Sequence, residues 1–230
     1  MFKKGSVSLA NRKNETIHHQ LDVSSFNILD KHPSIIFMAP EKGAGNTTSV
    51  ITSAYYLAQR LAAKTVIVDG NPFNPQLNSI FNISDFNSGF NSGSPGFFDV
   101  LADDSISYEN VIYSTDAPFD IVPAGSDFLN KINSRHQGYP GQGFEGFFDS
   151  LKQRYDSILF DACPVFSSHY FMRHLKCFDG VVMVIAGERT RWEAAKYLKE
   201  KIIEANGKPI GVILNKRKYY IPSWIYKHIV

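Results

Sequence analysis

The sequence contains no apolar run long enough to cross a membrane. Its longest, Gly180 to Gly187, is far shorter than the ~20 residues that a membrane-spanning helix needs. The basic pair Lys3-Lys4 is not followed by the apolar core of a signal peptide. We therefore expect a cytoplasmic protein that is not itself transmembrane, and peripheral association with the inner face of the membrane stays open.

Cysteine and an excess of one charge are also scarce. The two cysteines, Cys163 and Cys177, lie in or beside apolar segments without metal-ligand spacing, which predicts buried free thiols. The seven histidines form no cluster with carboxylates or cysteines, so no metal site built on histidine is expected. The net charge of +2 argues against nucleic acid as a partner.

The length of 230 residues suits one α/β domain. Residues 1–32 are polar and mildly basic, and they predict an N-terminal arm that is either flexible or docks on a partner or an anionic surface. Residues 33–218 carry the domain, and residues 219–230 form an aromatic C-terminal tail.

The stretch from Ser34 to Ala63 carries the main chemical signal. It reads SIIFM, then APEKGAGNTT, then a helical pattern, the order of a phosphate-binding strand, loop and helix. Small residues let backbone N–H groups approach phosphate oxygens, and the helix N-terminus adds unpaired donors. Such a loop normally ends in Gly-Lys-Ser/Thr, whereas here Asn46 stands between Gly45 and Thr47.

Alternating strands and helices follow along the chain. Besides the strand before the loop, strands are predicted at 64–69, 119–123, 157–161, 181–185 and 210–214, and helices at 97–101, 143–155 and 191–205. Apolar stripes predict the buried faces of the first and last helices: Val50, Ile51, Ala54, Leu57, Ala58 and Leu61, then Trp192, Ala195, Leu198, Ile202 and Ile203. The Asn/Ser/Gly-rich segment from Gly70 to about Gly96 predicts a long surface loop.

This alternation predicts an α/β fold with a doubly wound, mostly parallel sheet in a single domain. Ligands of such sheets bind at the carboxyl ends of the strands. Asp69 and Asp161 each end an apolar strand. They should therefore meet the phosphate loop at one edge of the sheet.

Seven segments, in order, resemble the bacterial tyrosine kinases of capsule and exopolysaccharide assembly, within the MinD/ParA-like branch of P-loop NTPases. They are APEKGAGNTT, TVIVDGNPFNPQLNSIF, GFFDVLADD, FDIVPAG, RYDSILFDACPV, FDGVVMVIAGERT and IGVILNKRK. The resemblance covers about residues 35–218 and implies the P-loop NTPase fold, with ATP or ADP and Mg²⁺ as cofactors.

The resemblance assigns roles to individual positions. Asp69 and Asp161 correspond to the catalytic carboxylates, and together with the Thr47 hydroxyl they would hold the metal. Asn215 corresponds to an asparagine that recognises the adenine edge. The cofactor-binding positions are Gly43, Ala44, Gly45, Asn46, Thr47, Thr48 and Asn215.

Two positions depart from the family pattern. Asn46 replaces the phosphate-contacting lysine, and Asn71 replaces the second carboxylate of an Asp-x-Asp motif. A charge-assisted hydrogen bond contributes about 1.5–3 kcal/mol, so Asn46 alone should weaken nucleotide binding about 10- to 100-fold. Phosphoryl transfer depends on positioning and charge stabilisation and should suffer more.

The resemblance leaves three functions open. The first is a catalytically impaired regulatory partner of the cytoplasmic end of a membrane chain-length-determining protein, or polysaccharide co-polymerase. The second is an active tyrosine autokinase that phosphorylates Tyr219, Tyr220 or Tyr226. The third is a MinD/ParA-like positioning ATPase, against which Glu41 counts because it replaces the signature lysine of that branch.

Two further features bear on these functions. Residues 18–30 lack the Glu- and Arg-rich motif used by the family for ring assembly, so the oligomeric state stays open. The aromatic residues of the tail are expected either to pack on the domain or to dock on a partner.

Overall fold

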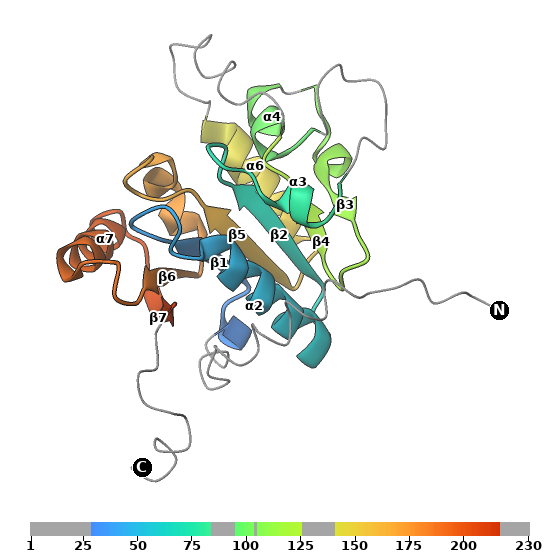
Figure 1. Cartoon of the computed structure of the whole chain (residues 1–230). Coiled ribbons are helices and arrows are strands. Elements are labelled where there is room, and N and C mark those ends of the chain that lie inside the picture. The colour runs from blue at the N-terminus through green and yellow to red at the C-terminus, as the bar shows by residue number, and fades with distance from the viewer. Residues whose placement is uncertain (1–28, 84–94, 104, 126–140, 217–230) are drawn as a thin grey trace.

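A seven-stranded sheet forms the centre of the computed structural model, which describes residues 29–83, 95–103, 105–125 and 141–216 (Figure 1). The strand order is β3-β4-β2-β5-β1-β6-β7. All neighbouring strands are parallel except β3 and β4. The strands are β1 Ser34–Met38, β2 Thr65–Gly70, β3 Tyr113–Ser114, β4 Asp120–Val122, β5 Ser157–Ala162, β6 Gly180–Ala186 and β7 Pro209–Asn215.

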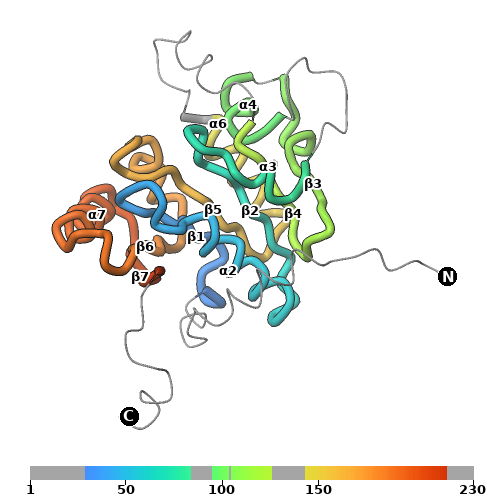
Figure 2. Tube along the Cα trace, viewed as in Figure 1, coloured from blue at the N-terminus to red at the C-terminus, as the bar shows by residue number. Residues whose placement is uncertain are grey.

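Helices cover both faces of this sheet (Figure 2). The α-helices are α2 Asn46–Arg60, α3 Leu77–Ile80, α4 Phe97–Ala102, α6 Gly141–Lys152 and α7 Trp192–Glu204. The 3₁₀ helix η2, Tyr108–Val111, lies between α4 and β3, and the 3₁₀ helix η3, Tyr170–Cys177, lies between β5 and β6. The predicted doubly wound α/β P-loop fold is therefore confirmed.

Each face of the sheet has its own core. On one face, side chains of α2 such as Val50 and Leu57 pack against Ile35 and Phe37 of β1. The strands β1, β2, β5 and β6 are buried along their whole lengths. Burial on both faces explains why their sequences are nearly continuous apolar runs rather than alternating ones.

The opposite face is covered by α4, α6, η3 and α7, and phenylalanine dominates its core. Phe97 lies at the centre, fully buried. Its ring lies within 4.8–6.2 Å, centroid to centroid, of five other phenylalanine rings, those of Phe98, Phe144, Phe147, Phe160 and Phe171. These separations suit edge-to-face and offset packing of aromatic rings.

The structure corrects several predictions. Trp192 is 74% exposed, Ile203 53% and Leu61 43%, so these three side chains do not belong to the buried stripes predicted for their helices. The expected loop after Gly70 contains the short helix α3, whose Leu77 is fully buried. The two-residue strand β3 was not predicted, and neither was η3.

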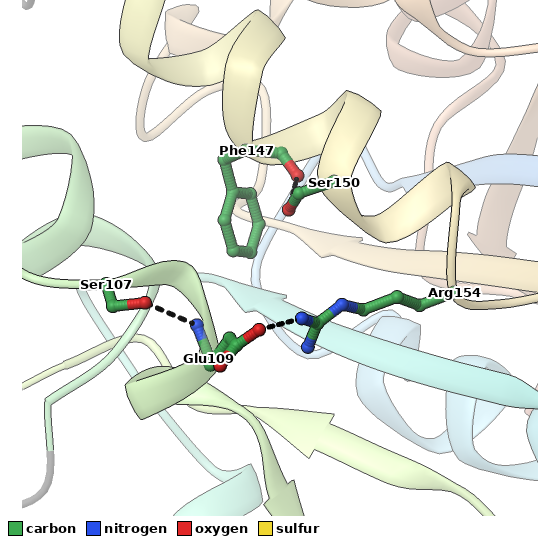
Figure 3. Close-up of polar contacts among 5 residues, drawn as sticks. All are labelled: Ser107, Glu109, Phe147, Ser150 and Arg154. Atoms are coloured by element: carbon green, nitrogen blue, oxygen red, sulfur yellow. Dashed lines mark hydrogen bonds and ion pairs between the residues drawn. The ribbon is translucent and has the colours of Figure 1, made fainter.

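Both cysteines are free thiols, as predicted. Cys163 is buried as expected, whereas Cys177 is only partly buried. Arg154, just after α6, forms an ion pair with Glu109 of η2, while the Ser150 hydroxyl donates to the Phe147 carbonyl (Figure 3).

Within the described residues, no helix has the length and apolar character required to cross a membrane.

Candidate functional site

The loop between β1 and α2 has the backbone of an anion-binding site. Gly43 and Gly45 adopt positive φ angles of 82° and 95°, a region that side chains disfavour. Alternating left- and right-handed residues turn successive N–H groups toward one point. Gly45 caps α2 without a side-chain hydrogen bond to the helix. The free N–H groups of the first turn thus remain available to a phosphate.

Asn46, at the position expected for lysine, is tied into the sheet. Its Nδ2 lies 2.9 Å from the Phe37 carbonyl oxygen, 2.7 Å from Asp161 Oδ1 and 3.2 Å from the Ala162 carbonyl oxygen. These acceptors fix the amide orientation, because a flipped amide would place oxygen against three oxygens. The Asn46 side chain thereby occupies the floor of the loop with donors but no charge.

Two buried carboxylates lie beside this amide. Asp69 at the end of β2 and Asp161 at the end of β5 are cross-strand partners in the parallel register. The Thr47 hydroxyl donates to Asp161 Oδ2 at 2.5 Å. Asp69 accepts backbone N–H groups from Asn71, Gln76 and Leu77 at 2.9–3.3 Å. Asp161 thus contacts the loop residues Asn46 and Thr47 directly, and Asp69 lies beside Asp161 on the neighbouring strand.

Burial raises the pKa of both carboxyl groups. Removal from water, opposed by the hydrogen bonds from Thr47 and Asn46, raises the pKa of Asp161 to about 6. Removal from water and then repulsion by Asp161 raise the pKa of Asp69 to about 7. Two neighbouring carboxylates that ionise reluctantly are stabilised by a cation.

The donor set suits Mg²⁺. Magnesium prefers oxygen ligands, often one or two carboxylates together with phosphate oxygens and water, and the Thr47 hydroxyl and Asp161 carboxylate provide adjacent oxygens. Among the described residues, the buried side-chain oxygens Asn46 Oδ1 and Asn71 Oδ1 have no hydrogen-bond partner. Such orphaned acceptors fit a site that receives water or a hydrated ion. The residues present therefore fit both phosphate and Mg²⁺.

Asn215, at the end of β7, reaches the same loop. Its Nδ2 donates to the Ala44 carbonyl oxygen at 2.9 Å. A Cβ atom at Gly45 would lie 1.9 Å from this nitrogen, so only glycine permits the contact. Gly43, Ala44, Gly45, Asn46 and Thr47 lie together here, while the Thr48 side chain is exposed at the first turn of α2.

Sequence reasoning missed three contacts that reach the loop. Arg189 Nη2 donates to the Lys42 carbonyl oxygen at 3.0 Å, and Lys216 Nζ to the Gly43 carbonyl oxygen at 2.6 Å. The Thr190 hydroxyl donates to the Glu41 carboxylate at 2.9 Å. The sequence has a basic run, KRK, that begins at Lys216, but no pattern in it places Lys216 or Arg189 at the loop. Tyr219, Tyr220 and Tyr226 lie outside the described residues.

Comparisons with known proteins identify the family of the chain. A family model described as "AAA domain" matches residues 33–208. The putative tyrosine-protein kinase CapB of Staphylococcus aureus is 22% identical over 184 residues, which cover 79% of this chain and 74% of CapB.

Two solved structures have the same fold. The chimerical protein CapA2B2 is 25% identical with a TM-score of 0.68, covering 90% of this chain and 82% of that one. The VpsO kinase domain is 23% identical with a TM-score of 0.74, covering 92% and 100%. The resemblance found in the sequence is confirmed, and the chain belongs to the AAA-domain family, in the P-loop group that contains the bacterial tyrosine kinases of capsule and exopolysaccharide assembly.

Proposed function

We propose that this protein binds Mg²⁺-nucleotide weakly, has lost most phosphoryl-transfer activity, and acts as a regulatory partner of a membrane chain-length-determining protein in exopolysaccharide or capsule export. The observation that carries the proposal is the environment of Asn46. Its amide donates to Asp161 and to two backbone carbonyls, within a loop that otherwise keeps its phosphate-binding backbone.

The remaining residues divide the binding among themselves. The backbone N–H groups of residues 43–48 would bind phosphate oxygens, and Asn215 would meet the base. Thr47, Asp69 and Asp161 would hold Mg²⁺, which when bound neutralises phosphate charge. A lysine at position 46 would neutralise part of the negative charge on the phosphate oxygens that it contacts, and Asn46 does not. Phosphoryl transfer depends on this compensation more than binding does.

The test is calorimetric titration with Mg²⁺-ATP and Mg²⁺-ADP of the natural protein and of Asn46→Lys. We expect saturable binding by the natural protein, at micromolar to sub-millimolar concentration. Asn46→Lys should bind about 10- to 100-fold more tightly, because it restores a charge-assisted hydrogen bond. If neither protein binds, the nucleotide-binding part of the proposal is wrong. Binding only by Asn46→Lys would leave partner docking as the function.

A second candidate, ATP-dependent autophosphorylation on tail tyrosines, has one observation in its favour. Both carboxylates that would organise Mg²⁺ are present as cross-strand partners, with the Thr47 hydroxyl on one of them. Transfer of labelled phosphate from ATP separates the candidates. Strong incorporation that is lost in Asp161→Ala would establish the kinase, and incorporation no higher than in Asp161→Ala would exclude it.

A further inference from the structure

The four loop residues before Gly45 are each held from outside by a different polar side chain. Thr190 bonds the side chain of Glu41, and Arg189, Lys216 and Asn215 bond the carbonyl oxygens of residues 42, 43 and 44 in turn. All four side chains come from two places only, the turn after β6 and the end of β7. Figure 1 shows this loop beside the β6 and β7 edge of the sheet.

Two of these side chains are cations. Arg189 and Lys216 are both exposed, and the guanidinium also limits the space at Gly43, where a Cβ atom would lie 2.9 Å from Arg189 Nη1. Lys216 adopts a positive φ of 56°, and its N–H donates to Asn215 Oδ1 at 2.8 Å. Since a positive φ is uncommon for lysine, the chain turns in an unusual way where the side chain meets the loop.

Each bonded carbonyl shares a peptide unit with an N–H group of the phosphate loop. The carbonyl of residue 42 belongs to the peptide of the Gly43 N–H, and that of residue 43 to the peptide of the Ala44 N–H. A donor on the carbonyl polarises the N–H of the same unit and makes it a stronger donor. A cationic donor adds the attraction of its charge for phosphate.

We propose that Arg189 and Lys216 are positioning residues of the nucleotide site, which hold the loop carbonyls outward and supply, from behind the loop, positive charge that position 46 no longer provides. The inference rests on the proposed nucleotide binding and goes beyond it, because it gives a role to two residues to which the resemblance assigned none. The ligand is a nucleoside diphosphate or triphosphate, whose phosphate chain is what this charge recognises.

The probe is Mg²⁺-ADP, titrated into the natural protein, Arg189→Met, Lys216→Met and Lys216→Arg. The matched controls are Arg191→Met and Lys208→Met. Arg191 is the exposed N-cap residue of α7, and Lys208 is exposed and directly precedes the first residue of β7, whereas Lys216 follows its last. Arg189→Met and Lys216→Met should each weaken Mg²⁺-ADP binding about threefold to tenfold, as loss of one nearby solvated charge implies. Lys216→Arg keeps the charge and should retain binding. The controls should leave the affinity unchanged.

Two further readouts separate charge from structure. The midpoint of thermal unfolding without nucleotide should be the same in all variants. In the Asn46→Lys background, Lys216→Met should have a smaller effect on affinity, because the loop lysine restores the missing charge.

Each outcome has a distinct meaning. If Arg189→Met and Lys216→Met both bind Mg²⁺-ADP as tightly as the natural protein does, the inference is wrong and the proposed function stands. Weak binding by Lys216→Arg, or a lowered unfolding midpoint that accounts for the loss, would reduce these side chains to structural supports and also overturn it. Absence of binding by the natural protein would refute the proposed function and the inference together.

Discussion

Replacing Asp161 with asparagine should stabilise the protein at alkaline pH. The asparagine keeps both hydrogen bonds: its oxygen can accept from Asn46 Nδ2, and its amide can donate to Thr47 Oγ1, whose hydroxyl rotates. The substitution removes only a buried charge. It also removes the repulsion that contributes to the raised pKa of Asp69.

The sign follows from the raised pKa of Asp161, about 6 against an ordinary 3.8. Between these values the folded protein holds more protons than the unfolded chain, so its free energy of unfolding falls as the pH rises. The loss reaches about 3 kcal/mol above pH 6. Asp69, with a pKa of about 7, extends the fall toward neutral pH. Below about pH 4 the carboxylate costs nothing.

The assay is thermal unfolding of the natural protein and Asp161→Asn in EDTA-containing buffer at pH 4.5, 6 and 8. At pH 8 the variant should unfold about 6–12 °C higher, given about 2–4 °C per kcal/mol for a chain of this size. At pH 4.5 about a third of the effect remains, about 1 kcal/mol, so the difference should shrink to about 2–4 °C. Asp149→Asn, an exposed carboxylate on α6, serves as control and should have no such pH dependence. Equal destabilisation by Asp161→Asn at all three pH values would refute the reasoning, because lost hydrogen bonds would then outweigh the relieved charge.

Two predictions concern the scaffold. Phe97→Ala should lower the free energy of unfolding, measured by urea denaturation, by about 3–5 kcal/mol, because it empties the centre of the aromatic core. The control Phe166→Ala, at a residue that is 57% exposed, should change it by no more than about 0.5 kcal/mol. Equal effects of the two substitutions would contradict the assigned core. Glu109→Gln breaks the exposed pair with Arg154 and should cost less than about 1 kcal/mol, so a larger loss would mean that this contact is not an ordinary surface ion pair.

Much of the fold could be predicted because its signals are local. A parallel strand buried on both faces needs a continuous apolar run, so β1, β2, β5 and β6 were visible in the sequence. The short elements had no such signal. Helix α3 has four residues and a single buried side chain, Leu77, which is too little for periodicity to register.

Helical periodicity also misplaced the ends of buried stripes. The pattern placed Trp192 on the same face as Leu198, and it does lie at helical spacing. Trp192 is nevertheless the first residue of α7 and is 74% exposed, whereas Leu198 and Ile202, farther along the helix, are fully buried. Periodicity identifies which side of a helix is apolar, but how much of that side the sheet covers depends on tertiary structure.

The site divides in the same way. The loop, Asp69 and Asp161 follow from motif and strand order, since parallel strands bring their carboxyl ends to one edge. The contacts of Arg189 and Lys216 with the loop carbonyls join residues 147 and 173 positions apart. These contacts depend on the side-chain geometry of two separate turns, and no short sequence pattern predicts that geometry.

The hydrogen bonds of the Asn46 side chain explain what the absence of lysine at this position changes and what it preserves. Alanine at this position would deprive Asp161 and two backbone carbonyls of a donor, and each buried polar group left unsatisfied costs about 1–3 kcal/mol. Asparagine supplies those donors through an uncharged amide, so the loop and the carboxylate stay in place without nucleotide. Neutralising the negative charge of the phosphates is the one function of lysine that asparagine cannot reproduce. The substitution therefore separates the structural role of this position from its catalytic role, which is why we expect an intact loop together with impaired transfer.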